Sequence, residues 1–312
     1  MQLVMTEGTY PNKKFFWMSR FWRLYPIYFI VLLFTITYLS VTDFGIFKNL
    51  LYMPLSWSFP LVFSNIFILG LDFTNFLTYE TYEKLVFITN MPSSVILQDN
   101  LLIKHYVLIP TAWSISVEIM FYLLVPYLTK VKNNVLILLT CFLFLLKALF
   151  FIFVTYKTPF YNQVFIFEFP LFFVGMLLIR YINLFERVKN NQFLIYTACV
   201  FAFFMTFATP YLGEIFHFKV LDIFNLILFV GILPIVFLIT KDNKLDRYVG
   251  LYSYPIYLWH IILLEIVSKN FTSLGAKVIV FCGLLFGLSF LSVHFIDEKI
   301  NKFRHKRYKG KT

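Results

Sequence analysis

Long apolar runs separated by short polar segments make up most of the chain. The runs are about 20 residues long, which is the length an α-helix needs to cross the hydrocarbon core of a bilayer. Such spans are helical, because backbone groups cannot stay unpaired in lipid. The pattern therefore predicts an all-α fold, a polytopic transmembrane helix bundle of about eight or nine membrane segments. The predicted segments are 22–41, 46–71, 112–129, 135–155, 164–182, 192–210, 220–240, 249–268 and 276–296.

The composition supports a membrane protein without a soluble domain. The 312 residues are 60% hydrophobic and 14% charged, whereas a soluble domain is about half apolar and about a quarter charged. We therefore expect a single integral-membrane domain over 1–312, ending in a basic cytoplasmic tail at 297–312. The three cysteines lie inside apolar runs, where they are typical of small buried side chains and not of a disulfide framework or a metal site.

The net charge of +11 comes from short basic clusters between the apolar runs. This placement is typical of membrane topology and argues against a nucleic-acid partner. If every cluster is cytoplasmic, the segments from 112 onward alternate correctly and 72–111 lies outside. Segment 46–71 then cannot make a simple crossing. With Pro54 and Pro60 in MPLSWSFP, it is either a re-entrant or kinked pair of half-helices, or an ordinary crossing with one loop wrongly oriented.

Arg20 and Arg23 lie three residues apart at the cytoplasmic end of the first segment, and on a helix they share a face. They could be a positive-inside anchor. They could equally be an anion clamp for phosphates, because arginine offers a rigid fork of donors that stays charged.

Glu118 is a carboxylate in an otherwise apolar segment, and we expect it near the outer face. Ser114 and Tyr122 flank it at four-residue spacing, so one polar stripe runs down the helix, and Trp113 suits the interface. Intramembrane carboxylates usually line a pathway or a site, although Glu118 could instead fix helix packing through a hydrogen bond.

His260 lies near the middle of its segment and shares a face with Ser253 and Tyr257. Its imidazole could carry a proton, or it could be a neutral ring bonded to a tyrosine or a carbonyl. Lys147 is similarly deep and needs a partner, for which Glu168 is the candidate.

Five motifs, taken in order, resemble those of the acyltransferase-3 family of integral-membrane acyltransferases. They are SRFWRLYPIY at 19–28, WSISVEIMFYLLVP at 113–126, FFVGML at 172–177, SYPIYLWH at 253–260 and FIDEK at 295–299. The resemblance implies a multi-pass protein of the bacterial cytoplasmic membrane. It would move an acetyl or other acyl group from cytoplasmic acetyl-CoA, without a metal, to a hydroxyl of a cell-envelope polysaccharide or its lipid-linked precursor.

The resemblance also implies roles for residues. Arg20 and Arg23 would hold the phosphates of acetyl-CoA, and Glu118 would orient the acceptor or handle its proton. His260, which would line the pore with Tyr257, is a second catalytic candidate only because its imidazole could substitute for a base in principle; its spacing matches a different family motif. The other residues expected to line the pore are Trp113, Ser114, Tyr122, Lys147, Glu168 and Ser253. The implied partners are acyl-CoA, a glycan or lipid-linked sugar and membrane lipids.

The chain departs from the family pattern at its start. The family begins with two further helices, the first of which carries the histidine usually taken as the catalytic base, whereas MQLVMTEGTYPNKKFF resembles only the connector after them. We therefore expect a start placed too late, a broken gene or a separate chain that supplies these helices. The alternatives to an active acyltransferase are an inactive truncated homologue and a transporter or flippase of glycan intermediates.

Overall fold

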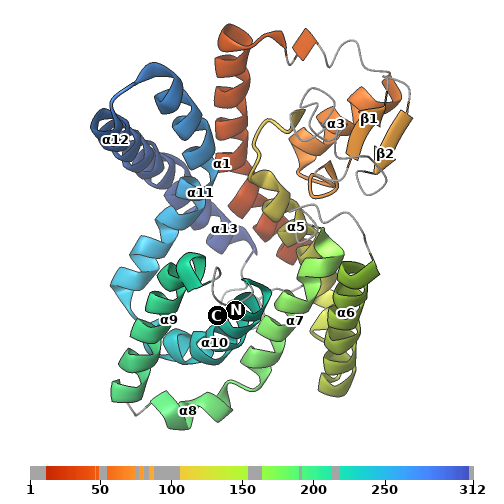
Figure 1. Cartoon of the computed structure of the whole chain (residues 1–312), viewed down its shortest axis with the longest axis vertical. Coiled ribbons are helices and arrows are strands. Elements are labelled where there is room, and N and C mark those ends of the chain that lie inside the picture. The colour runs from red at the N-terminus through yellow and green to blue at the C-terminus, as the bar shows by residue number, and fades with distance from the viewer. Residues whose placement is uncertain are drawn as a thin grey trace. The chain divides into compact units, whose positions relative to one another are not determined.

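The computed structural model describes residues 12–45, 47–48, 55–74, 77–80, 84–87, 106–153, 164–189, 192–212 and 218–308 (Figure 1). Over these residues the predicted all-α membrane bundle is confirmed. Its helices are α1 (Lys13–Thr42), α3 (Leu55–Phe67), α5 (Ala112–Leu128), α6 (Asn133–Phe153), α7 (Phe165–Arg180), α8 (Asn183–Lys189), α9 (Gln192–Leu212), α10 (Phe218–Thr240), α11 (Lys244–Asn270), α12 (Leu274–Ser292) and α13 (Glu298–Tyr308), with a π-helical turn, η7 (Val293–Asp297), before α13.

The helices group into two compact units. One contains residues 6–172 and 251–312, and the other is formed mainly by Phe173–Gly250. Within the described residues, the long apolar helices α1, α6, α11 and the continuous stretch from α12 into α13 are each long enough to cross a membrane. The bounds of most predicted segments lie within a few residues of the bounds of a helix. Helix α1 differs, because it begins at Lys13 and not at residue 22.

Segment 46–71 differs from a simple crossing. Its described part contains α3, which ends at Phe67, before the predicted segment does. The chain then turns through Ile68 and Gly70, which both adopt positive φ angles of 58° and 78°. Ile68 is fully buried, so the irregular backbone is enclosed by protein, as membrane depth requires. The structure therefore favours the interrupted alternative for this segment.

Strands β1 (Leu77–Glu80) and β2 (Lys84–Phe87) pair antiparallel, with Leu77 opposite Phe87. The hairpin lies in 72–111, which was predicted only to be an outer loop. Four-residue strands are too short to show a reliable alternation of polar and apolar positions.

Helix α1 lies at the centre of the first unit. The hydroxyls of Tyr25 and Tyr28 donate to the carbonyls of Phe67 and Asn65, where α3 ends. From α11, the Tyr254 hydroxyl donates to Leu24 O at 2.8 Å. Aromatic side chains thus hold three elements together by hydrogen bonds to backbone oxygens.

The second unit packs α9 against α10, which lie side by side (Figure 1). Asn225 Nδ2 donates to Thr209 Oγ1 at 2.7 Å, and the rings of Phe201 and Phe224 meet edge to face. A polar contact between two apolar helices favours one register, because lipid offers the Asn225 amide no hydrogen-bond partner.

Replacing Asn65 tests the anchoring of α3. The buried Asn65 amide donates to Leu61 O and Tyr106 O at 2.9 and 3.1 Å and accepts from Leu108 N at 2.8 Å. Asn65→Ala should lower the free energy of unfolding by ~2–4 kcal/mol, because buried backbone groups lose their partners. Denaturation in detergent micelles measures this. Asn270→Ala is the control, since Asn270 is exposed and makes one local bond. Equal effects of the two changes would show that Asn65 is not an anchor.

Candidate functional site

Tyr122 is the residue around which the predicted polar side chains gather. Its ring is buried in α5, and its hydroxyl donates to the Glu118 carboxylate one turn earlier. The Arg20 guanidinium lies 5.3 Å from the centre of this ring and 5.2 Å from that of Phe16. A guanidinium beside two aromatic faces is held by cation–π attraction, which strengthens away from water.

The two predicted arginines have different environments. Arg20 is only 7% exposed, whereas Arg23 is exposed. Arg23 nevertheless lies within electrostatic reach of Tyr122, of Tyr254 on α11 and of Asp297 in η7. Arg20 is therefore a fixed positive charge inside the bundle, and Arg23 is open to an incoming anion.

Glu118 lies close to Arg20, since both contact Tyr122. Helix α5 runs beside the first half of α1, where Trp17 Nε1 donates to Tyr122 O at 3.1 Å. Beside the second half of α1, around Thr35 and Leu39, lies the non-helical segment 107–110. Glu118 is therefore in the same cluster as Arg20 and Tyr122, because α5 begins only at Ala112.

Ser114 and Tyr257, predicted from separate motifs, are in direct contact. Their hydroxyl oxygens are 2.6 Å apart, so that one hydroxyl donates to the other, and both oxygens also lie within hydrogen-bond distance of Thr111 O, at 3.2 and 2.9 Å respectively. This contact joins the start of α5 to the middle of α11 and continues the polar stripe from Glu118 toward the far end of α1.

His260 bonds within its own helix. Its Nδ1 lies 2.8 Å from Tyr257 O, so Nδ1–H donates to this carbonyl. This arrangement matches the expected ring bonded to a carbonyl. Ser253, which was predicted to share a face with His260, is exposed, and Trp113, which was predicted at the interface near Glu118, is partly buried.

The five motifs of the sequence meet in this structure. Phe172, from FFVGML, stacks on Phe121 of α5 with ring centres 4.4 Å apart. The closing motif contributes Asp297, which accepts from Asn301 Nδ2 at 2.9 Å and lies within reach of Arg23.

A family model described as an acyltransferase domain matches residues 9–295. The chain belongs to the acyltransferase-3 family. No curated protein and no solved structure matches it. Membership makes this chain a membrane acyltransferase that transfers groups other than aminoacyl groups.

The acyltransferase also contains the ion pair expected between Lys147 and Glu168. Lys147 Nζ lies 3.5 Å from Glu168 Oε1, and each side chain is about one-fifth exposed, at 22% and 20%. Lys147 also donates to Phe167 O at 3.2 Å. Because no described contact links this pair to Tyr122, we interpret it as a connection between α6 and α7.

Asp72 is a buried carboxylate of the acyltransferase that the sequence analysis placed in the outer loop. It is 0% exposed, in the turn after α3, and accepts from Ser116 Oγ at 2.9 Å and from Phe165 N at 3.2 Å. Burial raises the pKa of Asp72, whereas these hydrogen bonds act to lower it. Nothing in the local pattern distinguishes Asp72 from the acidic residues that follow it. In the described part of the chain, no three His, Cys, Asp or Glu side chains are grouped as for a metal ion.

Breaking the Lys147–Glu168 pair should destabilise the acyltransferase. Lys147→Met leaves a mostly buried carboxylate without its cation and should cost roughly 2–3 kcal/mol, less than a fully buried pair would. The double variant Lys147→Met/Glu168→Met should recover much of that loss. Denaturation of the two single variants and the double variant measures the coupling. Lys269→Met is the matched control, because its pair with Glu265 is exposed and should contribute below ~1 kcal/mol. Purely additive single effects would contradict a coupled pair.

Proposed function

We propose that this acyltransferase moves an acetyl group from cytoplasmic acetyl-CoA to a hydroxyl of a cell-envelope polysaccharide or its lipid-linked precursor, in the bacterial cytoplasmic membrane. The observation that carries the proposal is the meeting of Arg20, Arg23 and Glu118 around Tyr122. It combines a site for an anionic donor with a carboxylate that can act on a hydroxyl.

The donor side is built around the arginines. The exposed guanidinium of Arg23 suits the phosphates of coenzyme A, because its planar fork can make two parallel hydrogen bonds. Arg20 also lines a pocket of 290 Å³ whose walls are mostly apolar, with Trp17, Leu24 and Tyr122 among them. This pocket suits the uncharged arm and the thioester of the donor, next to Glu118.

The transfer has a defined balance of bonds and protons. The acceptor oxygen attacks the thioester carbon, so that a C–O bond forms, the C–S bond breaks and the thiolate leaves. The acceptor loses a proton, which the departing thiol finally receives. In this proposal Glu118 orients the acceptor or takes its proton, while His260 and Tyr257 line the path of the acceptor.

The interrupted segment at α3 is the one observation that favours a second function, a transporter or flippase of glycan intermediates, because broken helices are common in transporters. Purified protein in proteoliposomes, given radiolabelled acetyl-CoA and cell-envelope glycan, distinguishes the two. Label on the glycan supports acetyl transfer. Movement of a glycan intermediate across the membrane without acyl-CoA supports the transporter.

Arg23→Ala should weaken acetyl-CoA binding by ~10-fold or more, because a charge-assisted contact to phosphate is lost. Arg23→Lys should restore part of the affinity through its charge alone. Equilibrium binding of labelled acetyl-CoA in nanodiscs measures both. Arg247→Ala is the control, since Arg247 is an exposed arginine of another basic cluster. If Arg23→Ala binds as tightly as Arg247→Ala does, Arg23 has no role in donor binding.

Glu118→Gln should slow acetyl transfer by ~100-fold or more, the range expected for loss of a proton-handling group. The amide oxygen can still accept the hydrogen bond of Tyr122, so acetyl-CoA affinity and thermal stability should stay unchanged. Transfer rates, donor binding and melting are measured on the same preparation. A variant that melts early but transfers normally per folded molecule would assign Glu118 to packing.

A further inference from the structure

A second cavity, of 170 Å³, lies within the first unit between α1, α11 and the segment 107–110. Its α1 wall runs from Val31 to Asp43, and its α11 wall runs from Leu258 to Glu265. Both helices begin at basic clusters, so by the positive-inside rule the ends near Asp43 and Glu265 face outward. The cavity thus opens on the side opposite to the arginines.

The inner end of the cavity adjoins the polar stripe of the site. Leu258, in its wall, follows Tyr257, and Pro110 precedes Thr111, the residue that accepts the Tyr257 hydroxyl. Ser114 joins the same hydrogen-bonded group, one turn before Glu118. The wall of the cavity thus includes the chain neighbours of Tyr257 and Thr111, which are hydrogen-bonded to each other and to Ser114.

Thr35 gives the wall an unused polar group. Its side chain is 1% exposed, and its hydroxyl has no hydrogen-bond partner among the described residues. A helical threonine can normally bond to the carbonyl four residues earlier. A buried hydroxyl without a partner costs free energy. Its oxygen is covered in this conformation, so a hydroxylated ligand in the cavity would offset that cost once the side chain rotates toward it.

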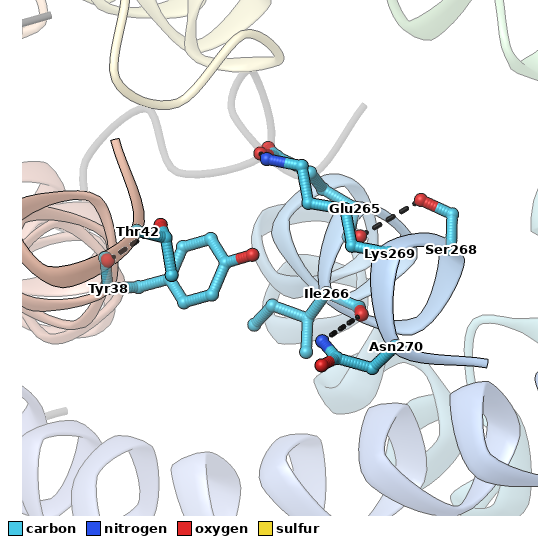
Figure 2. Close-up of polar contacts among 7 residues, drawn as sticks. All are labelled: Tyr38, Thr42, Glu265, Ile266, Ser268, Lys269 and Asn270. Carbon is cyan, nitrogen blue, oxygen red and sulfur yellow. Dashed lines mark hydrogen bonds and ion pairs between the residues drawn. The ribbon is translucent and has the colours of Figure 1, made fainter. Parts of the chain in front are cut away.

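The rim carries groups of both charges. Figure 2 shows Tyr38 projecting from α1 toward the last turns of α11, which hold Glu265 and Lys269. Lys269 Nζ lies 2.7 Å from Glu265 Oε1 and within electrostatic reach of Tyr38 and Asp43. Two carboxylates against one ammonium leave these rim groups with one net negative charge.

We infer that this cavity binds the acceptor as a single neutral, hydroxyl-bearing sugar ring. The carboxylates and the ammonium can accept from and donate to sugar hydroxyls, and the apolar walls suit the C–H faces of the ring. A volume of 170 Å³ is below the ~300–1,000 Å³ of sites for drug-sized ligands, which restricts the occupant to one ring. The net negative rim disfavours acidic sugars. The identification of this sugar as the acceptor rests on the proposed acetyl transfer. The binding of a sugar in the cavity does not depend on that proposal.

Saturation-transfer NMR on the full chain in detergent tests this inference, with methyl glucoside as the neutral probe and glucuronic acid as its anionic counterpart. The protein should bind methyl glucoside and exclude glucuronic acid. Thr35→Leu, which fills the cavity, should reduce methyl glucoside binding by ~10-fold or more and leave acetyl-CoA binding unchanged. Ser268→Ala is the control, because Ser268 is exposed and bonds only to Glu265 O.

Loss of acetyl-CoA binding would show that Thr35→Leu does not fold. In that case two further variants test the inference. Thr35→Val keeps the shape and removes the hydroxyl, so it should weaken methyl glucoside binding. Glu265→Gln should weaken methyl glucoside binding and increase glucuronic acid binding. Absence of sugar binding, binding unaffected by all three variants, or preference for glucuronic acid overturns the inference. Sugar binding that these variants abolish, without acetyl transfer to any glycan, supports the cavity and refutes the proposed function instead.

Discussion

The buried Arg20 guanidinium is the constraint on which the rest of the site depends. A charge inside a lipid-embedded bundle is costly unless the surrounding groups compensate for it. Here the faces of two aromatic rings provide part of that compensation, and one of them, Tyr122, is bonded to the Glu118 carboxylate. Because Phe16 belongs to α1 and Tyr122 to α5, holding the charge also fixes how these helices meet. The position of Glu118 follows from the same contact.

Hydrogen bonds from aromatic residues to backbone oxygens complete this arrangement. Trp17, Tyr25, Tyr28 and Tyr254 each donate to a carbonyl on a neighbouring element. Such side chains combine a large apolar body with one polar atom, so they pack in an apolar bundle and still satisfy a backbone group. This pairing explains how the short helix α3 can end beside the middle of α1, since protein groups and not lipid meet the backbone there.

The sequence could predict the helices well and their contacts only in part. Membrane-spanning helices can be recognised in a sequence because crossing a bilayer requires about 20 apolar residues. The Lys147–Glu168 pair was predictable because an isolated deep charge requires a partner. The closeness of Glu118 to Arg20 was not predicted, because it depends on how α5 packs against α1, and hydropathy does not show how helices pack. The burial of Asp72 depends on Ser116 and Phe165, which are distant in sequence, so no local pattern marks it.

Helix α5 connects the two sides of the proposed reaction. From Ser114 to Tyr122 it rises about 12 Å, with Glu118 halfway between them. Ser114 contacts Tyr257 beside the outward cavity, and Tyr122 contacts Arg20 beside the arginine pocket. A single carboxylate at the midpoint can therefore face an acceptor from one side and a donor from the other. An acyl group transferred at Glu118 would cross the bilayer without either substrate having to cross. A polar stripe on α5 suits this transfer, because the two cavities lie near its two ends.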